Sequence, residues 1–429
     1  MSLERGINIL GYINKQFGLG EGVRSNIRSI SSTGIPYVLN DFKEKISPDI
    51  KDENTDGLVI TEENPYDINL IQINVDNFER LLNSNGASYF AGKYNIGFWA
   101  WELELFPSSY QKYIDLLDEI WVPSNFCLNA ISQISNKPVL RFMHSIDIPE
   151  NDITRNDLGL PADKLIYLTI FDYHSSLHRK NPYAVIKAFE DAFGDDHSKL
   201  LVLKASIGVE YPNAKNELYS YIENKKNIML IEDILPREKL YGLINNCDVF
   251  VSMHRSEGFG LTMAEAMYLG KPVIATAYSG NTEFMSAFNS VLIPYTLIPT
   301  GDNYMYSDLN NYWADVDINE VSLALKRLGE SPSERKKLGD SAKKHIKDLL
   351  SPKTVGKGMK SRIDYIYDIC LPRREKDLQE TLSELTIENI NLKRKVDALK
   401  QIKMVKWKLA FKNLKNKLFK RNRKYIWED

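Results

Sequence analysis

Residues 251–285 read VSMHRSEGFGLTMAEAMYLGKPVIATAYSGNTEFM, and this stretch gives the clearest indication of the fold. The apolar run DVFVSM precedes a loop with two glycines, and the segment TMAEAMYL at 262–269 predicts a helix. A second apolar run, KPVIAT, follows directly. A strand, a helix and another strand in this order predict a parallel pair whose carboxyl ends lie at one edge of a sheet.

The same alternation of apolar runs and amphipathic segments continues outward from this stretch. Between residues 6 and 145, the runs that predict strands are INILGYI, PYVLND, DINLIQINV, YNIGFWAW, EIWVPS and PVLRFMH. A second set consists of LIYLTIFDY, LLVLKAS, NIMLIED, DVFVSM, KPVIAT and SVLIPY. Helices are predicted between them, for instance at 107–118 and 182–193. The expected fold class is α/β, with two Rossmann-like domains that face a cleft.

The chain has 429 residues, which is enough for two domains of ordinary size and additional segments. The polar segment 146–164 carries two prolines and no sustained period, so we place a linker there. The predicted units are an N-terminal domain at 1–148, a C-terminal domain at 149–350, a closing helix at 351–372 that returns to the N-terminal domain, a coiled coil at 373–402 and a basic amphipathic tail at 403–429.

Composition narrows the function classes. The formal net charge of −2 argues against a nucleic-acid-binding protein as a whole. The three cysteines, Cys127, Cys247 and Cys370, are widely spaced and odd in number, which predicts buried thiols in a reducing compartment. The sequence shows neither a signal-peptide pattern nor an apolar stretch long enough to cross a bilayer. We therefore expect a cytoplasmic protein.

The stretch GYINKQFGLGEGVRS at 11–25 combines clustered glycines with a predicted helix. Such a turn lets the backbone approach a phosphate, which the N–H groups of the next helix can bind. As a dinucleotide fingerprint the spacing fails, because Gly18 and Gly20 fit the first two positions of G-x-G-x-x-G but Val23 takes the third. Asp41 would be the ribose ligand in that interpretation. The stretch indicates either a phosphate loop or a tight turn without a ligand.

Leucine recurs every seven residues near the C-terminus. The repeating positions are Leu378, Leu385, Leu392 and Leu399, and the alternate positions are Leu382, Asn389 and Val396. This pattern predicts a short coiled coil, in which Asn389 fixes the register at some cost in stability. The segment would associate with a second copy or with another protein. The alternative is an amphipathic helix that lies on the protein's own core.

Residues 403–424, KMVKWKLAFKNLKNKLFKRNRK, contain many Lys and Arg residues and no acid. Apolar residues recur there at steps of three and four, namely Met404, Trp407, Phe411, Leu414 and Leu418. A helix with this pattern suits the headgroup region of an anionic membrane. Nucleic-acid binding is disfavoured, because the aromatic residues align with the aliphatic ones and do not interleave for base stacking. A solvated disordered tail is the remaining alternative.

The residues best suited to bind a ligand lie in the loop and helix of 251–285. Gly258 and Gly260 let the main chain approach a ligand, and the helix start can hold a phosphate. Glu265 has a structural interpretation, a capping box with Thr262, and a functional one, a carboxylate that accepts hydrogen bonds from ribose hydroxyls. Glu257, at the carboxyl end of a strand, is expected to point into the cleft.

Glu257 and Glu265 form an E-x7-E pair within SEGFGLTMAEAMYLGKPVIAT. Together with the following GN, this segment resembles the donor site of glycosyltransferase family 4, retaining enzymes with the GT-B fold. The likeness covers most of residues 6–365, including RKNP at 179–182 and the closing SPKTVGKGM. By this resemblance, Glu257 contacts sugar hydroxyls near the reacting carbon and Glu265 holds the ribose. The main-chain N–H groups of Gly258, Phe259 and Gly260 bind the sugar and the diphosphate.

The resemblance also implies a cationic clamp on the leaving group. Lys180 resembles the lysine that neutralises the departing diphosphate. The family's partner arginine lies several residues earlier, where this chain has FDYHSS. Arg179, Arg255 or neither completes the clamp.

The N-terminal domain supplies the opposite side of the cleft in the GT-B fold. A glycine-rich loop after its first strand lies near the diphosphate and the acceptor, and Gly18, Gly20 and Glu21 match that placement.

Three more N-terminal residues are candidates for the cleft. Trp101 and Glu102, at a strand end, either face a sugar or, for the tryptophan, belong to the core. His144 is either a cleft histidine near the reacting carbon or a hinge residue.

The resemblance implies a retaining, metal-independent hexosyltransferase of surface polysaccharide synthesis. Its donor is a nucleotide-diphosphate sugar, with GDP-mannose as a candidate, and its acceptor is a saccharide or a lipid-linked saccharide. No cofactor is expected, and neither a D-x-D at a strand end nor a His/Cys cluster suggests a metal. The expected location is the cytoplasmic side of the cell membrane, bound peripherally. The alternatives are an NAD-dependent oxidoreductase and a catalytically idle scaffold recruited to a membrane.

Overall fold

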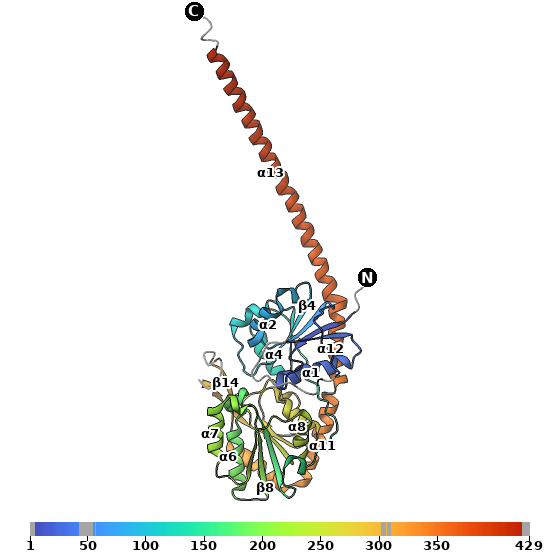
Figure 1. The fold of residues 1–429 in the computed structure, drawn as a ribbon, viewed down its shortest axis with the longest axis vertical. Helices are drawn as coiled ribbons and strands as arrows, with labels where there is room; N and C mark the ends of the chain where they lie inside the picture. Colours follow the sequence, from blue (N-terminus) through green and yellow to red (C-terminus); the bar gives the residue numbers. More distant parts are fainter. Residues whose placement is uncertain (1–4, 43–54, 56, 302–305, 307–309, 423–429) are drawn as a thin grey trace, which may run out of the picture. The chain divides into compact units, whose positions relative to one another are not determined.

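The computed structural model describes residues 5–42, 55, 57–301, 306 and 310–422. The chain forms two compact units, Met1–Arg362 and Ile363–Asp429 (Figure 1). The first unit contains two α/β domains, each built on its own parallel sheet. The second unit is helical.

Six strands form the sheet of the N-terminal domain, in the order β2-β1-β3-β4-β5-β6, and all neighbours are parallel. Their bounds are Ile7–Gly11 (β1), Tyr37–Asp41 (β2), Ile68–Gln72 (β3), Tyr94–Phe98 (β4), Glu119–Val122 (β5) and Val139–Arg141 (β6). Each strand lies inside one of the predicted apolar runs. The central strands β1, β3 and β4 are buried throughout, as expected of parallel strands covered on both faces.

Helices connect these strands. Their bounds are Gly18–Ser31 (α1), Phe78–Asn85 (α2), Gln111–Ile114 (α3) and Asn125–Ser132 (α4). The helix predicted at 107–118 is wrong in length, since only a short 3-10 turn at Ser108–Tyr110 and α3 form there. After α3, the Asp118 carboxylate accepts the backbone N–H of Asn95 at 2.8 Å, just before β5 begins.

The sheet of the C-terminal domain has the order β12-β11-β10-β7-β8-β9, again with parallel neighbours. The strands are Leu165–Ile170 (β7), Lys199–Lys204 (β8), Ile228–Ile231 (β9), Val249–Ser252 (β10), Val273–Thr276 (β11) and Val291–Ile293 (β12). The connections run outward in opposite directions from β7 and β10. In open α/β sheets, ligands bind beyond the carboxyl ends of the strands at such a reversal point.

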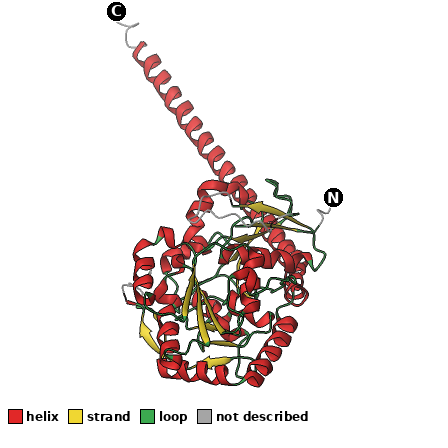
Figure 2. Cartoon of the chain, turned by 60° about the horizontal axis from the view of Figure 1, so that its bottom comes forward, coloured by secondary structure: helices red, strands yellow, loops and turns green. Residues whose placement is uncertain are grey.

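Helices lie on both faces of this sheet (Figure 2). Their bounds are Leu177–Lys180 (α5), Pro182–Phe193 (α6), Pro212–Ile222 (α7), Arg237–Asn246 (α8), Leu261–Tyr268 (α9), Ile318–Glu330 (α10) and Pro332–Leu349 (α11). A hairpin of β13 (Tyr295–Pro299) and β14 (Tyr312–Val316) accompanies them. Alternate residues of β8 enter different apolar clusters, since Leu201 and Leu203 pack on one side and Leu200 and Val202 on the other. The sheet is therefore the centre of two hydrophobic layers.

Helix α12 (Pro352–Tyr365) carries the chain back to the N-terminal domain. Arg362 pairs with the buried carboxylate of Glu119 in β5. A Cβ atom on Gly356 would lie 2.2 Å from the backbone oxygen of Ser29 in α1, so only glycine permits this close approach. The two domains of the first unit are thus connected twice, by the segment between β6 and β7 and by α12.

The second unit consists mainly of one helix, α13 (Leu371–Asn422), which follows a π-helical turn at Ile366–Cys370. The segments 373–402 and 403–422, predicted separately from their patterns, are continuous in this helix. The remainder of the predicted basic tail, 423–429, lies outside the described residues. No helix in the described part of the chain is both long and apolar enough to cross a membrane.

Candidate active site

The loop that follows β10 lies against the N-terminal domain. The Ser124 hydroxyl, at the N-cap of α4, donates a hydrogen bond of 2.6 Å to the carbonyl oxygen of Gly258. The Ser256 hydroxyl donates to the carbonyl oxygen of Glu102. The residues of the SEGFG segment are therefore placed at the interface of the two domains, beyond the carboxyl end of β10.

Glu257 lies at the centre of a charged cluster in this interface. Its Oε1 pairs with the ammonium of Lys180 and lies 3.3 Å from Nη1 of Arg179. Arg179 Nη2 is 3.7 Å from Oε1 of Glu102, which comes from the N-terminal domain. Burial acts to raise the pKa of Glu257, but Lys180 and Arg179 hold it at about 2. Glu257 is therefore ionised at every physiological pH.

The short helix α5 holds both cations in place. It is flanked by Ser176 at φ 66° and Asn181 at φ 52°, so the chain turns sharply at both ends. The Arg179 guanidinium donates to the backbone oxygens of Ser175 and Ser256, at 3.2 and 2.9 Å. Because α5 follows β7 and Glu257 follows β10, the cluster forms where the strand order reverses.

Arg255, the other arginine considered for the clamp, has a different environment. Its guanidinium is 2.8 Å from the Asp315 carboxylate in β14 and lies over the Trp313 ring. Arg255 thus holds the β13–β14 hairpin, and Arg179 is the arginine that lies beside Lys180 and Glu257.

The backbone ahead of α9 presents N–H groups. Within the described part of the chain, the amides of Gly258, Phe259 and Gly260 donate no hydrogen bond. Gly260 has a φ of 96°, and a Cβ atom there would lie 2.5 Å from the Met263 side chain. Unpaired N–H groups at the start of a helix form an anion-binding arrangement.

The capping box predicted for Thr262 and Glu265 is wrong. Helix α9 begins at Leu261, its N-cap is Gly260, and no side chain caps it. The helix starts one residue earlier than predicted, directly after Gly260, whose left-handed conformation favours glycine.

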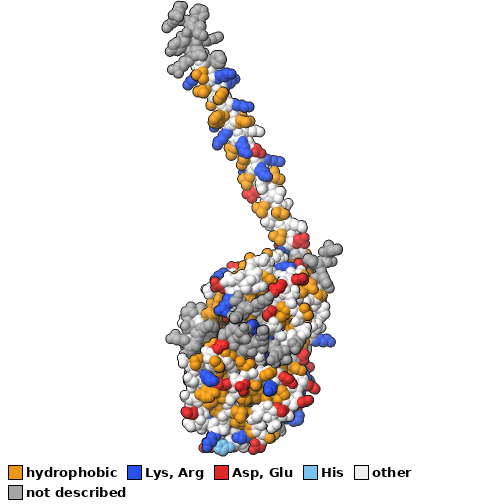
Figure 3. All heavy atoms as spheres, viewed as in Figure 1, with side chains coloured by type: hydrophobic (Ala, Val, Ile, Leu, Met, Phe, Trp, Pro, Cys, Tyr) orange, Lys and Arg blue, Asp and Glu red, His pale blue; other side chains and the backbone are white. Residues whose placement is uncertain are grey.

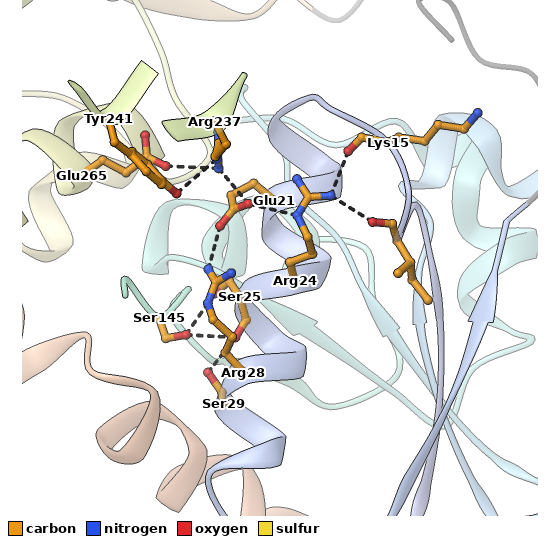
Figure 4. Close-up of polar contacts among 11 residues, drawn as sticks. Lys15, Glu21, Arg24, Ser25, Arg28, Ser29, Ser145, Arg237, Tyr241 and Glu265 are labelled. Carbon is orange, nitrogen blue, oxygen red and sulfur yellow. Dashed lines mark hydrogen bonds and ion pairs between the residues drawn. The ribbon is translucent and has the colours of Figure 1, made fainter. Parts of the chain in front are cut away.

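Glu265 is instead part of a buried ion-pair network (Figure 4). Its Oε1 lies 3.2 Å from Nη2 of Arg237, and its Oε2 has no hydrogen-bond partner among the described residues. Arg237 also donates through Nε to the Tyr241 hydroxyl at 3.1 Å. Burial raises the pKa of Glu265 to about 7, and Arg237 opposes the rise. A buried carboxylate oxygen without a donor is costly unless a ligand or water satisfies it.

The network crosses the domain interface through Glu21 in α1. Glu21 Oε2 lies 2.7 Å from Arg237 Nη2 and 3.1 Å from Arg24 Nε, and Oε1 lies 2.6 Å from Arg28 Nη2 (Figure 4). Burial acts to raise the pKa of Glu21, but the surrounding arginines hold it at about 2. The carboxylate is occupied by three guanidinium groups, so its charge stabilises the interface.

The predicted glycine-rich loop is wrong in its secondary structure. Gly18 and Gly20 belong to the first turn of α1, which begins at Gly18. A Cβ atom on Gly20 would lie 2.1 Å from the backbone oxygen of Lys15, and one on Gly22 would lie 2.9 Å from the His144 ring. The space beside these two glycines is therefore filled by the Lys15 backbone and the His144 side chain.

Asp41 fixes the turn that precedes this helix. Its carboxylate accepts the backbone N–H of Ile13 at 3.1 Å and the side-chain amide of Asn14 at 3.1 Å. It therefore has a structural role in place of the ribose contact that a dinucleotide fingerprint would require.

His144 is buried between the two domains. Its ring centroid lies 5.2 Å from that of Phe98 in β4 and 5.3 Å from that of Phe259 in the loop between β10 and α9. Burial lowers the pKa of His144 to about 4, so the imidazole is neutral. Its Nδ1 has no hydrogen-bond partner among the residues that the structure describes.

Trp101 and Glu102 are neighbours with different environments. Trp101 is 4% exposed, donates through Nε1 to the Leu105 carbonyl oxygen and packs on Phe106, so the core interpretation is correct. Glu102 keeps a partly exposed side chain beside Arg179. Of the pair, Glu102 is the residue whose side chain reaches the charged cluster.

Two supporting residues were not singled out from the sequence. His254 Nε2 faces both the Tyr278 carbonyl oxygen and Oδ1 of Asn281, at 3.2 and 3.1 Å, which requires a proton on Nε2. Its Nδ1 then accepts from the Ser252 hydroxyl at 3.0 Å. His254 and Asn281 thereby fasten the loop that carries Glu257, and only their position beside the motif could have indicated this.

No sequence pattern indicated a role for Arg237 either. It opens α8 within LPREKLY, where an arginine at the start of a helix gives no functional signal. Its importance depends on contacts with Glu21 and Glu265, which are distant in the chain.

In the described part of the chain, no group of three or more His, Cys, Asp or Glu side chains could hold a metal ion.

Known proteins resemble this chain in family and in fold. Residues 151–345 match the family model described as glycosyl transferases group 1. Among solved structures, HepE of Anabaena in complex with UDP and glucose is 12% identical, covers 84% of this chain and 99% of its own, and has a TM-score of 0.59. Sucrose-phosphate synthase from Thermosynechococcus elongatus is 15% identical, with coverage of 85% and 100% and a TM-score of 0.60. A glycosyltransferase from Rickettsia africae is 14% identical, with coverage of 85% and 99% and a TM-score of 0.60.

These likenesses define the class of fold. Two Rossmann-like domains that face each other, the GT-B arrangement predicted from the sequence, extend over most of the first unit. The segment that matches the glycosyl transferase model is the domain that carries Lys180, Glu257 and Glu265.

Proposed function

We propose that the chain is a retaining glycosyltransferase of family 4 that transfers a sugar from a nucleotide-diphosphate donor to a hydroxyl group. The observation that carries the proposal is the Glu257 cluster. A permanently ionised carboxylate lies beside two cations, and unpaired backbone N–H groups immediately precede the next helix. This combination suits a ligand with sugar hydroxyls at one end and a diphosphate at the other.

The chemistry requires charge stabilisation on both sides of the breaking bond. The diphosphate gains negative charge as it departs, and Lys180, Arg179 and the amides of Gly258–Gly260 are placed to stabilise it. Glu257 accepts hydrogen bonds from sugar hydroxyls and stabilises the positive charge that develops on the ring. The acceptor hydroxyl attacks from the face that the diphosphate leaves, and a phosphate oxygen takes its proton, so the anomeric configuration is retained. None of these steps uses a metal ion.

Glu265 is proposed to hold the ribose. Its Oε2 is buried without a partner among the described residues, and two adjacent hydroxyls of a ribose would satisfy it. HepE of Anabaena, which has a related fold, was solved with UDP and glucose, and this supports a nucleotide sugar as the ligand. We therefore place UDP-sugars beside GDP-mannose as candidate donors.

The acceptor is proposed to be a saccharide or lipid-linked saccharide of a surface polysaccharide. The N-terminal domain provides Glu102 on its side of the interface, close to Arg179. A carboxylate in that position accepts hydrogen bonds from acceptor hydroxyls.

A donor screen tests the proposal. UDP-glucose, UDP-N-acetylglucosamine, GDP-mannose and NAD are compared for thermal stabilisation and for release of the nucleoside diphosphate. A donor present at 100 times its Kd stabilises the folded state by about 2.7 kcal/mol. One nucleotide sugar is expected to stabilise the protein and to be hydrolysed slowly, and Glu265→Gln is expected to weaken that stabilisation. Stabilisation by NAD alone would favour the oxidoreductase alternative, and no stabilisation by any nucleotide sugar would contradict the proposal.

The oxidoreductase alternative has little structural support. A dinucleotide needs open space at the first glycines after β1, but the Lys15 backbone oxygen and the His144 ring occupy the positions beside Gly20 and Gly22. The alternative of a catalytically idle scaffold does not explain the charged cluster of Glu257, Lys180 and Arg179.

We propose that α13 attaches the enzyme to the cytoplasmic face of an anionic membrane and associates through the coiled-coil segment 378–399. Trp407 and Phe411 are 76% and 68% exposed. Lysine side chains surround the apolar residues of this part of the helix (Figure 3). Apolar side chains enter the headgroup layer while lysines contact anionic lipids.

Vesicle co-sedimentation tests the membrane proposal. The protein is expected to bind phosphatidylcholine vesicles that contain phosphatidylserine, and deletion of 403–429 is expected to abolish binding. Trp407→Glu should weaken binding more than Leu409→Glu, because residues two apart lie on nearly opposite sides of a helix and the added charge is the same. Equal binding by the deletion variant and the intact chain would refute the proposal.

A further inference from the structure

We propose that α13 forms a parallel, in-register homodimer through the seam between Leu378 and Leu399, so that the partner of this segment is a second copy of the chain. Leucine occupies four successive d positions, Leu378, Leu385, Leu392 and Leu399. The a positions between them hold Leu382, Asn389 and Val396. All seven lie on α13, one uninterrupted helix of 52 residues.

The seam has no cover within the described chain. Its six apolar side chains are between 48% and 67% exposed. A stripe of large aliphatic residues over three heptads is unfavourable in water, and burying each of them against a second helix yields about 1.5–3 kcal/mol when complete. A helix of the same pattern satisfies this requirement by knobs-into-holes packing.

Asn389 favours a second copy of the same helix as the partner, and it favours a parallel orientation of the two helices. In a parallel, in-register pair, the a position of one helix faces the a position of the other, so each Asn389 amide meets its own copy and forms a hydrogen bond. In an antiparallel pair, a positions meet d positions, and the amide would be buried against leucine without a partner. The two flanking leucine layers, Leu385 and Leu392, then close the seam on either side.

Charges beside the seam agree with this arrangement. Glu388 is a g residue and Lys393 is the e residue of the next heptad, which in a parallel dimer lie across the interface from each other. The pair occurs twice by symmetry, on the two sides of Asn389. One pair opposes it, since Lys395 and Lys400 bring like charges together at a solvent-exposed edge where salt screens them.

A parallel dimer has a consequence for the basic end of the helix, and this step rests on the proposed membrane binding. The segments after residue 403 of both copies emerge at the same end of the coiled coil. Two weak membrane contacts joined in this way bind with a higher avidity than one. An antiparallel dimer would place the two basic segments at opposite ends.

Sedimentation equilibrium of the full chain, without lipid, tests the dimer separately from the membrane proposal. The wild type is expected to have the mass of two chains and to dissociate on dilution. Leu385→Lys, in the seam, is expected to give the mass of one chain at every concentration. Ile387→Lys is the matched control, because Ile387 is 59% exposed against 57% for Leu385 but occupies an f position outside the seam.

A wild type that stays at the mass of one chain overturns the proposal, and so does a control variant that dissociates as readily as Leu385→Lys. Direction is tested by oxidising Asn389→Cys in a Cys370→Ser background, with Ile387→Cys for comparison. A disulfide-linked dimer from Asn389→Cys alone supports the parallel register. A chain that has the mass of two but does not cross-link at 389 overturns that register.

Discussion

The guanidinium of Arg237 lies 3.2 Å from the carboxylate of Glu265. The same nitrogen is 2.7 Å from Glu21, so one arginine side chain joins a residue of the N-terminal domain to Glu265, the residue proposed to bind the ribose (Figure 4). All three side chains are buried or nearly so. The charge state of Glu265 therefore depends on the contact between the two domains.

Donor affinity is predicted to increase as the pH rises through about 7. Burial raises the pKa of Glu265 to about 7, and only the ionised carboxylate can accept a hydrogen bond from each of two ribose hydroxyls. The ionised fraction increases roughly tenfold between pH 6 and pH 8 for such a pKa, and the donor KM should fall by a similar factor. Initial rates at varied donor concentration measure this, with Glu265→Gln as the variant whose profile is flat. A wild-type KM that stays constant over this range would refute the role of Glu265.

Arg237→Met is predicted to move the midpoint of that profile to higher pH. Arg237 opposes the rise in the pKa of Glu265, so its removal favours the protonated carboxyl and weakens donor binding at pH 7. Arg28→Met is the comparison variant, because Arg28 contacts Glu21 at 2.6 Å and lowers the pKa of Glu265 less than Arg237 does, so its midpoint should move less. Arg237→Lys, which keeps the positive charge, should move the midpoint less than Arg237→Met does. An unchanged midpoint in Arg237→Met would show that Arg237 has a structural role alone.

The same titration predicts a change in stability. The folded-state pKa of Glu265 is raised, so the folded chain holds a proton between about pH 4.5 and 7 that the unfolded chain has lost. The corresponding stability is present at low pH and is lost as the pH rises through 7. Glu265→Gln should be more stable than the wild type at pH 8, by up to about 3 kcal/mol, and the difference should shrink towards pH 5. Thermal unfolding at both pH values measures it, and a less stable variant at pH 8 would contradict the pKa.

Two glycines of the first turn of α1 are predicted to differ sharply on substitution. A Cβ atom on Gly20 would meet the Lys15 backbone oxygen at 2.1 Å, whereas one on Gly18 would meet nothing within 4 Å. Gly20→Ala should destabilise the protein by about 1–3 kcal/mol through overpacking. Gly18→Ala should be neutral or stabilise it by up to about 1 kcal/mol, because alanine is the better helix former. Equal unfolding temperatures for the two variants would exclude the packing role of Gly20.

Sequence patterns predicted the two sheets well because most of the strands are short, mainly apolar runs, as burial on both faces of a parallel sheet requires. The strand β10 and helix α9 of the opening stretch, for example, were placed within a residue. The glycines at 18–22 were predicted as a loop but lie in α1, because the pattern GLGEG occurs both in loops and at helix starts. The close packing of Gly20 on the Lys15 backbone is visible only in the structure.

The site was partly predictable. Glu257, Lys180 and Glu265 were indicated by their spacing and neighbours, and the structure brings the first two together. The partner of Glu265 could not be predicted, because Arg237 and Glu21 become neighbours only when two domains meet. Trp101 illustrates the same limit, because aromatic residues beside carboxylates occur both in cores and in sugar sites.

The rate of sugar transfer by Glu257→Gln is the direct test of the assignment of the Glu257 cluster as the active site. The substitution keeps the shape of the side chain and removes the charge that Lys180 and Arg179 face. With the donor found in the screen and a saccharide acceptor, the variant is predicted to lose roughly 10²–10³-fold in kcat while its circular dichroism stays that of the wild type. Glu190→Gln, which removes an ion-paired carboxylate on α6, is predicted to keep full activity. Turnover by Glu257→Gln equal to that of Glu190→Gln would contradict the assignment of this cluster as the active site.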